Sequence, residues 1–164
     1  MSLPDRLSLL DASFLYLETP NVSMNVGGLA VLDPATAPSK TLRPEALVEL
    51  LANRIHLVPR LRRKLSFVPL NLARPVWVDD PGFRVERHVN HSELPPSATH
   101  RDLVDLVQDV HAARFDRRRP LWEVHLITGL PKRRAAVVMR WHHALVDGMS
   151  GVDIAGILFD RSPN

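Results

Sequence analysis

The chain of 164 residues contains no cysteine, which excludes disulfide bonds and metal sites built on thiolates. Aromatic residues make up only 5% of it, and no basic segment is interleaved with them, so we expect no nucleic-acid partner. No stretch approaches the ~18 consecutive apolar residues that suggest a membrane span. Charged residues interrupt the apolar N-terminus, unlike a secretory signal. The sequence therefore predicts a cytoplasmic protein.

The composition is that of one globular domain, with 45% hydrophobic and 24% charged residues. Alternating strand and helix patterns predict an α/β layer protein. Strands are expected over residues 24–32, 65–68, 76–78, 83–89, 121–128 and 135–142. Helices are expected over residues 8–18, 44–57 and 99–115, and again after residue 150. The last two strands could pair as a hairpin across the turn at residues 129–134.

Several positions within these elements carry finer predictions. The first helix is expected to be amphipathic, with Leu10, Phe14 and Leu17 on one face. Trp122 is expected to lie in the core. Two capping-box patterns mark helix starts, at Thr99 with Asp102 and at Ser150 with Asp153.

The run His142-His143-Ala144-Leu145-Val146-Asp147-Gly148 directly follows the apolar segment 135–139. This composition would produce His-His-x-x-x-Asp-Gly by chance roughly once in a thousand such chains. A histidine is the side chain best suited to take a proton near neutral pH. Because neighbouring strand residues point to opposite faces, one histidine can be packed while the other is presented at the strand end. This geometry argues against one metal ion held by both.

The other residues of this run leave alternatives open. Asp147 could turn back toward His143, or it could pair with an arginine and fix the loop. Gly148 permits a positive φ. The structural alternative is a strand–turn–helix corner with incidental histidines. Elsewhere no His-x-x-x-His pair suggests a zinc site, and His88 and His91 are expected to be solvent-exposed polar residues.

The basic residues are clustered at 60–64, 117–119 and 132–134, and the formal net charge is +3. Such clusters can attract phosphates or anionic lipid headgroups. They can equally be ordinary solvated surface.

The run 142–151, His-His-Ala-Leu-Val-Asp-Gly-Met-Ser-Gly, resembles the active-site motif of bacterial wax ester synthase/diacylglycerol acyltransferases. Pro120-Leu121-Trp122 is similar to the Pro-Leu-Trp motif of this family. The segments 7–18, 24–28 and 58–62 also look like family segments. The resemblance implies an α/β fold of the two-layer sandwich type seen in chloramphenicol acetyltransferase.

This resemblance further implies that His143 is the general base for acyl transfer from fatty acyl-CoA, a co-substrate, to diacylglycerol or a long-chain alcohol. The products are triacylglycerol or wax ester, and no bound cofactor or metal is expected. His142, Asp147 and Gly148 would support the motif. Direct transfer is expected because the chain has neither cysteine nor a Gly-x-Ser-x-Gly elbow. The basic clusters imply peripheral contact with the inner face of the membrane or with a lipid droplet.

Members of this family are longer and have a second α/β half. Residues 1–164 are therefore expected to form the N-terminal half-domain, and a C-terminal half or a full-length homologue is an expected partner. One alternative is a catalytically silent remnant that binds such a partner or lipid. Another is a condensation-type acyltransferase.

Overall fold

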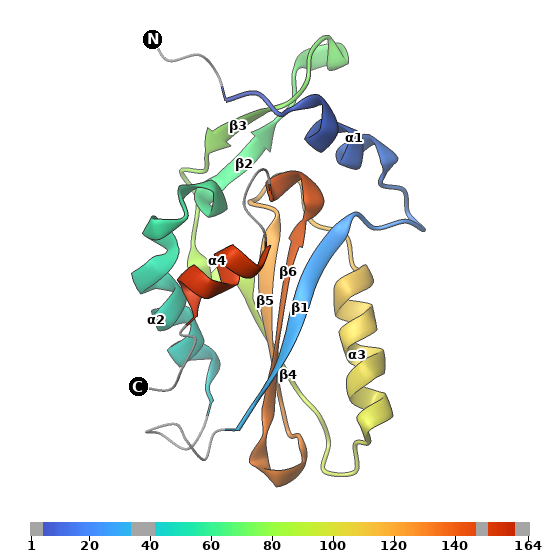
Figure 1. Ribbon diagram of the computed structural model, residues 1–164, viewed down its shortest axis with the longest axis vertical. Coiled ribbons are helices and arrows are strands. Elements are labelled where there is room, and N and C mark those ends of the chain that lie inside the picture. The colour runs from blue at the N-terminus through green and yellow to red at the C-terminus, as the bar shows by residue number, and fades with distance from the viewer. Residues whose placement is uncertain (1–4, 34–41, 147–150, 160–164) are drawn as a thin grey trace.

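The computed structural model describes residues 5–33, 42–146 and 151–159 (Figure 1). The helices are α1 (Leu9–Leu17), α2 (Pro44–Arg54), α3 (His100–Ala112) and α4 (Gly151–Leu158). The strands are β1 (Asn25–Leu32), β2 (Arg63–Ser66), β3 (Val76–Asp79), β4 (Val89–Glu93), β5 (Trp122–Thr128) and β6 (Ala135–His142). Two short 3₁₀ helices adjoin the main sheet: η5 (Val85–His88) directly precedes β4, and η7 (His143–Leu145) directly follows β6.

The main sheet has the strand order β1-β6-β5-β4. β6 pairs antiparallel with both β1 and β5, so the predicted hairpin of β5 and β6 is confirmed. β4 runs parallel to β5, and α3 forms the crossover between them. Figure 1 shows α3 on one side of the sheet and α2 with α4 on the other, while α1 and the β2–β3 ribbon lie beyond its upper end. The chain is thus a mixed α/β fold.

Apolar alternation on β5 and β6 explains why the sheet has two covered faces. Trp122, Val124 and Leu126 point into the larger core with α2 and α4. Ile127 and Val138 pack against the helix α3 in a second core. Trp122 is buried as predicted, and its indole N–H donates to the carbonyl of Leu61 at 2.7 Å.

Two sequence predictions about local structure are wrong. The segment 83–89 is not a strand, because η5 occupies residues 85–88 and β4 begins only at Val89. Within η5, Val85 and His88 are both buried, three residues apart, a spacing that suits a helical turn rather than a strand. α1 forms where expected, but Leu10 and Leu17 are 67% and 58% exposed. Asp11, Ala12 and Leu15 are its buried residues instead.

The predicted capping box at Thr99 is present, with Thr99 and Asp102 bonded reciprocally at the start of α3. That helix ends at Ala112, three residues earlier than expected. Ser150, the cap predicted for α4, lies outside the described residues. Across residues 5–33, 42–146 and 151–159, no helix is long and apolar enough to cross a membrane.

The basic clusters are largely ion-paired. Arg63 contacts Asp5 and Asp79, and Lys64 contacts Asp80. Arg118 and Arg119 share Asp116. The segment 132–134 lies at a tight turn, in which Lys132 and Arg133 have positive φ.

Candidate active site

The two histidines of the motif stand where β6 ends and η7 begins. His142 is the last residue of β6, opposite Asn25 of β1, and His143 opens η7. The backbone N–H of His143 donates to the carbonyl of Met24 at 2.8 Å, which ties η7 to the start of β1. The chain therefore bends sharply between the two rings, as expected at a strand end.

His142 is a structural residue. Its side chain is buried, and its Nδ1 accepts the backbone N–H of Ala144 at 3.0 Å, which caps η7. The neutral ring must then carry its proton on Nε2. Burial lowers the pKa of His142 to about 4, an effect that the nearby Glu18 carboxylate only partly opposes. With its lone pair engaged and its pKa depressed, His142 is a poor general base.

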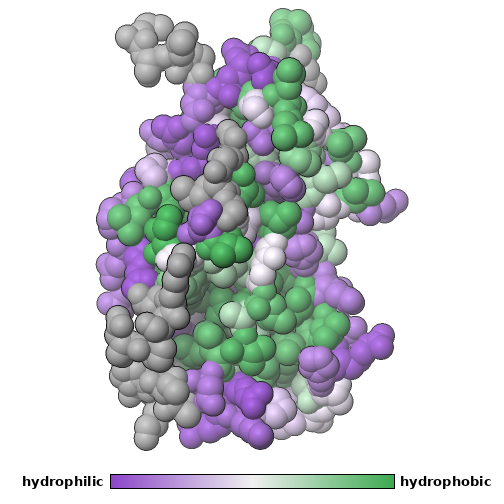
Figure 2. Space-filling view, viewed as in Figure 1, coloured by the Kyte–Doolittle hydropathy of each residue, from purple (hydrophilic) through white to green (hydrophobic). Residues whose placement is uncertain are grey.

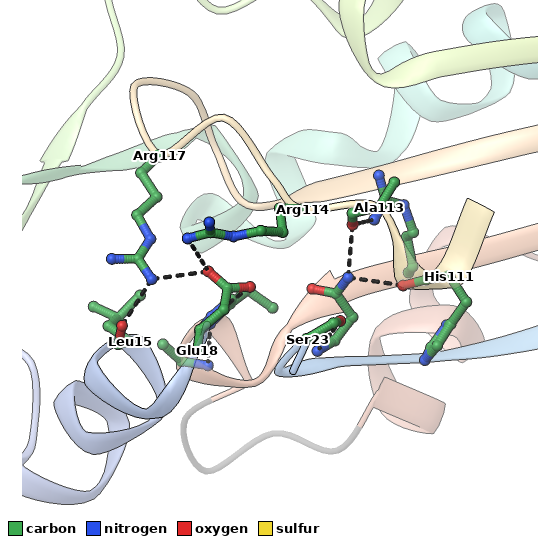
Figure 3. A network of polar contacts seen from close by, with 11 residues as sticks. Leu15, Glu18, Ser23, His111, Ala113, Arg114 and Arg117 are labelled. Carbon is green, nitrogen blue, oxygen red and sulfur yellow. Dashed lines mark hydrogen bonds and ion pairs between the residues drawn. The ribbon is translucent and has the colours of Figure 1, made fainter. Parts of the chain in front are cut away.

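Nε2 of His142 faces a buried carboxylate, Oε1 of Glu18, at 3.8 Å. The other oxygen of Glu18 accepts from Arg117 at 2.8 Å and lies 3.5 Å from Arg114 (Figure 3). Burial raises the pKa of Glu18, but the hydrogen bond and charge of Arg117 outweigh it, so the pKa is lowered. Glu18 is therefore an anion that holds the Nε2–H tautomer of His142 by electrostatic attraction.

Arg117 also donates to the carbonyl of Leu15 at 2.7 Å, in the last turn of α1. A cation that bonds the free carbonyls at a helix C-terminus is favourable both as a cap and with the helix dipole. The same guanidinium thus fixes α1 and Glu18 to the segment after α3.

A second set of polar contacts fixes β1 and β6 to the C-terminal end of α3. The side-chain amide of Asn25 donates to the carbonyls of His111 and Ala113, each at 2.9 Å (Figure 3). Buried Arg140 also donates to the carbonyl of Ala113, and it pairs with Glu123 at 2.7 Å. These contacts set the position of the strand ends that carry the histidines.

His143 has a different environment from His142. Its ring stacks on Phe14 of α1, with a centroid separation of 3.8 Å and an angle of 24°. The residue is partly exposed, although its Nδ1 is buried and has no hydrogen-bond partner among the described residues. The stacking fixes the plane of the ring and is not a hydrogen bond to either nitrogen. Of the two histidines, His143 is therefore the one that can exchange a proton with a substrate.

Asp147 and Gly148 lie outside the described residues. Just beyond them, Gly151 begins α4 against the indole ring of Trp141, and any Cβ at Gly151 would overlap that ring. The small residue lets α4 pack directly beside the histidine-bearing strand.

The sequence did not single out Glu18 or Arg117 as partners of the motif. Glu18 entered only as part of an N-terminal resemblance, and Arg117 as one member of a basic cluster. Their contact joins residues 99 positions apart, which no local pattern encodes. The expectation for His88 is wrong as well. This residue is buried, bonds the carbonyl of Trp122 at 2.8 Å and stacks on its indole ring, whereas His91 is exposed.

Within the part of the chain that the structure describes, no group of three His, Asp or Glu side chains is placed to hold a metal ion.

Comparison with known proteins identifies relatives of this arrangement. Residues 7–164 match the wax ester synthase/diacylglycerol acyltransferase catalytic domain family. The chain is 40% identical over 157 residues to a Mycobacterium tuberculosis protein named "probable diacylglycerol O-acyltransferase tgs3", covering 96% of this chain and 57% of the relative. It is 38% identical to tgs1 of the same organism, of which it covers 34%. The chain thus spans between about a third and somewhat over half of these relatives.

Solved structures give the same result. The wax ester synthase/diacylglycerol acyltransferase from Marinobacter aquaeolei VT8 superposes with a TM-score of 0.72 at 34% identity, over 92% of this chain and 37% of that one. The starter condensation domain of rhizomide synthetase superposes with a TM-score of 0.65 at 15% identity, over 90% of this chain and 34% of that one. The latter similarity concerns the fold alone, and both agree with the predicted sandwich.

Proposed function

Because the chain belongs to the wax ester synthase/diacylglycerol acyltransferase family, we propose that it supplies the histidine-bearing half of a fatty O-acyltransferase. The acyl donor is fatty acyl-CoA, and the acceptor is diacylglycerol or a long-chain alcohol. The observation that carries the proposal is the division of labour between the two histidines. His142 is buried and its Nδ1 accepts the N–H of Ala144, whereas the ring of His143 is partly exposed beside Phe14 and makes no hydrogen bond to a described residue through its buried Nδ1.

In the proposed reaction, His143 removes the proton of the acceptor hydroxyl as the oxygen attacks the thioester carbonyl carbon. A carbon–oxygen bond forms and the carbon–sulfur bond breaks. The sulfur leaves as the CoA thiolate, and the His143 imidazolium returns the proton to it. Ester and CoA are the products. The chain supplies no cysteine nucleophile, which supports direct transfer without an acyl-enzyme.

The role of His142 is to position His143. Its ring caps η7, the turn that opens with His143, and Glu18 with Arg117 holds that ring in place. Asp147 and Gly148 are proposed to shape the loop that follows.

We assign residues 1–164 to the N-terminal half of the family domain. The relatives that it matches extend well beyond the aligned part, and this supports a C-terminal half, or a full-length homologue, as the partner that completes the site. Excluding water from the thioester requires a closed cavity.

The direct test measures transfer of radiolabelled palmitate from palmitoyl-CoA to dioleoylglycerol or hexadecanol. The chain is assayed alone, and together with the C-terminal part of the Marinobacter relative. Labelled triacylglycerol or wax ester, formed by the mixture and absent with the C-terminal part alone, is the expected result. If no mixture forms either ester, the function fails, and a non-catalytic partner of a full-length homologue becomes the better interpretation.

We also propose that the protein contacts membrane or lipid-droplet surfaces peripherally. Four apolar side chains on α1 are more than half exposed: Leu9, Leu10, Tyr16 and Leu17. The same helix carries Phe14, whose ring stacks on His143, the proposed base. Apolar side chains on a helix beside basic residues favour an anionic interface. Flotation with liposomes should increase with phosphatidylglycerol content and should fall for the double variant Leu10→Ser/Leu17→Ser. Flotation that changes neither with phosphatidylglycerol content nor in the double variant would contradict the proposed membrane contact.

A further inference from the structure

One buried polar group next to the histidine motif has no partner in the fold. The side chain of Trp141, the residue before His142, is only 7% exposed, yet its indole N–H makes no hydrogen bond to a described residue. By contrast, the buried indole N–H of Trp122 donates to the carbonyl of Leu61. Because nearly all buried polar groups in native proteins are hydrogen-bonded, an unpaired donor inside a core requires an explanation. A ligand that brings an acceptor oxygen would provide one.

The side chain of Trp141 borders a cavity of about 310 Å³ between β1, β6 and α4. The other described residues that line this cavity are small or apolar: Val26, Gly27, Gly28, Met139, Gly151, Val152 and Ala155. Figure 2 shows hydrophobic side chains over β1 beside α4. Among the described lining residues, Trp141 is the only one whose side chain can donate a hydrogen bond. A single donor in apolar surroundings is typical of a site that orients an uncharged ligand.

The edge of the indole ring that carries the N–H faces the start of α4. A Cβ built at Gly151 would overlap Cζ2 of Trp141 and would lie 2.6 Å from Cε2, the carbon bonded to the indole nitrogen. Gly151 itself lines the cavity, so the donor edge of the ring lies at the cavity wall. A Cβ built at Gly28, another lining residue, would have no neighbour within 4 Å. The glycines therefore leave room for a ligand group beside the N–H.

The side chains of Trp141 and His143 lie on the same side of the strand end. They are two residues apart, and His142 between them has an extended backbone, with φ −72° and ψ 141°. Two residues of extended chain span at most about 7 Å. The opposite strand gives the same placement, because Val26 pairs with Trp141 and Met24 accepts the backbone N–H of His143. One molecule can therefore reach both side chains, through two neighbouring but separate groups.

The two proposed acceptors differ in the group that such a donor would recognise. In a diacylglycerol, an ester carbonyl oxygen lies a few bonds from the free hydroxyl, and this oxygen accepts hydrogen bonds. A long-chain alcohol has its hydroxyl and no second oxygen. The thioester carbonyl of the acyl donor is the reacting group itself, so it meets the hydroxyl oxygen at His143. A donor one step along the strand from His143 therefore suits an ester carbonyl that does not react.

We propose that the indole N–H of Trp141 binds an ester carbonyl oxygen of diacylglycerol while the free hydroxyl lies at His143, and that this contact favours diacylglycerol over long-chain alcohols as the acceptor. The inference rests on the proposed function and names a residue that determines its acceptor specificity. A long-chain alcohol in the same site leaves the N–H without a partner, so it gains nothing from Trp141.

The first test replaces Trp141 with phenylalanine, which keeps an aromatic ring and removes the N–H. The measurement is kcat/KM for dioleoylglycerol and for hexadecanol, with palmitoyl-CoA as the donor and the C-terminal part of the Marinobacter relative present. We expect kcat/KM for dioleoylglycerol to fall about three- to tenfold relative to that for hexadecanol, the usual effect of one hydrogen bond between neutral groups.

The matched control is Trp122→Phe, which removes an indole N–H that is already bonded to Leu61. This variant should leave the ratio of the two kcat/KM values unchanged. Equal losses for both acceptors in Trp141→Phe would overturn the proposal, because the N–H would then act on the thioester or only on folding. An unchanged ratio with unchanged rates would overturn it as well.

A second measurement does not depend on how well the variant folds. The chain has three tryptophans, so the ¹⁵N-labelled protein gives three indole N–H signals, which single Trp→Phe variants assign. In the same mixture with the unlabelled C-terminal part, 1,2-dihexanoylglycerol should move the Trp141 indole proton downfield, whereas hexanol should not. No shift, a shift confined to Trp77 or Trp122, or an equal shift with hexanol would overturn the assignment.

The two proposals can fail separately. An unchanged acceptor ratio in a Trp141→Phe mixture that still forms ester would remove the role of Trp141 and leave the function. A diacylglycerol-specific shift of the Trp141 signal, in mixtures that form no ester, would establish the binding contact and remove the acyltransferase function.

Discussion

Replacing His143 with alanine is expected to lower acyl transfer about 10²–10⁴-fold, the usual contribution of a positioned general base. The reason is that no second group described near η7 can take over the proton. His142 is buried, its Nδ1 accepts the N–H of Ala144, and its pKa is lowered to about 4 by burial. The measurement is the initial rate of labelled ester formation with palmitoyl-CoA and dioleoylglycerol, in the presence of the C-terminal part of a relative.

The control for this experiment is His91→Ala, which removes an exposed histidine of β4 that has no place in the site. That variant should keep the wild-type rate. A His143→Ala rate within a factor of three of the wild type would refute the assignment of the base.

Stability is expected to fall as the pH is lowered from about 6.5 to about 4, largely through His142. In the unfolded chain this histidine protonates near pH 6.5, whereas in the fold its pKa is lowered to about 4 by burial. Between those two values the unfolded state binds one more proton than the folded state, so acid favours unfolding. The stabilisation is complete above pH 6.5, and about 3 kcal/mol of it is lost by pH 4. Such a loss is a large fraction of the 5–15 kcal/mol that a domain typically has.

The measurement is urea denaturation at several pH values between 7.5 and 4, for the wild type and for His142→Asn. The asparagine oxygen can accept the N–H of Ala144 in place of Nδ1, but it does not titrate. The wild type should lose more stability per pH unit than this variant. Glu18, His88 and His125 also have lowered pKa values and act in the same direction, so the variant keeps part of the dependence. Equal slopes for the two proteins would show that His142 is not the buried neutral group described above.

The elements that sequence patterns predicted well are those whose pattern is repeated along many residues. β5 and β6 have long alternating or continuous apolar runs, and they pair as expected. The start of α3 was predicted correctly because its signal, the capping box of Thr99 and Asp102, involves only residues close together in the sequence. The prediction for segment 83–89 failed because its alternation is short, and the burial of Val85 together with the stacking of His88 on Trp122 favoured a 3₁₀ turn instead.

For the site, the sequence by itself determined the pair of histidines, their place at a strand end and the family to which the motif belongs. These follow from residue identity and from the two-residue period of a strand. Only the tertiary structure decided which histidine is free to act, because this depends on Ala144, Glu18 and Arg117 meeting around His142.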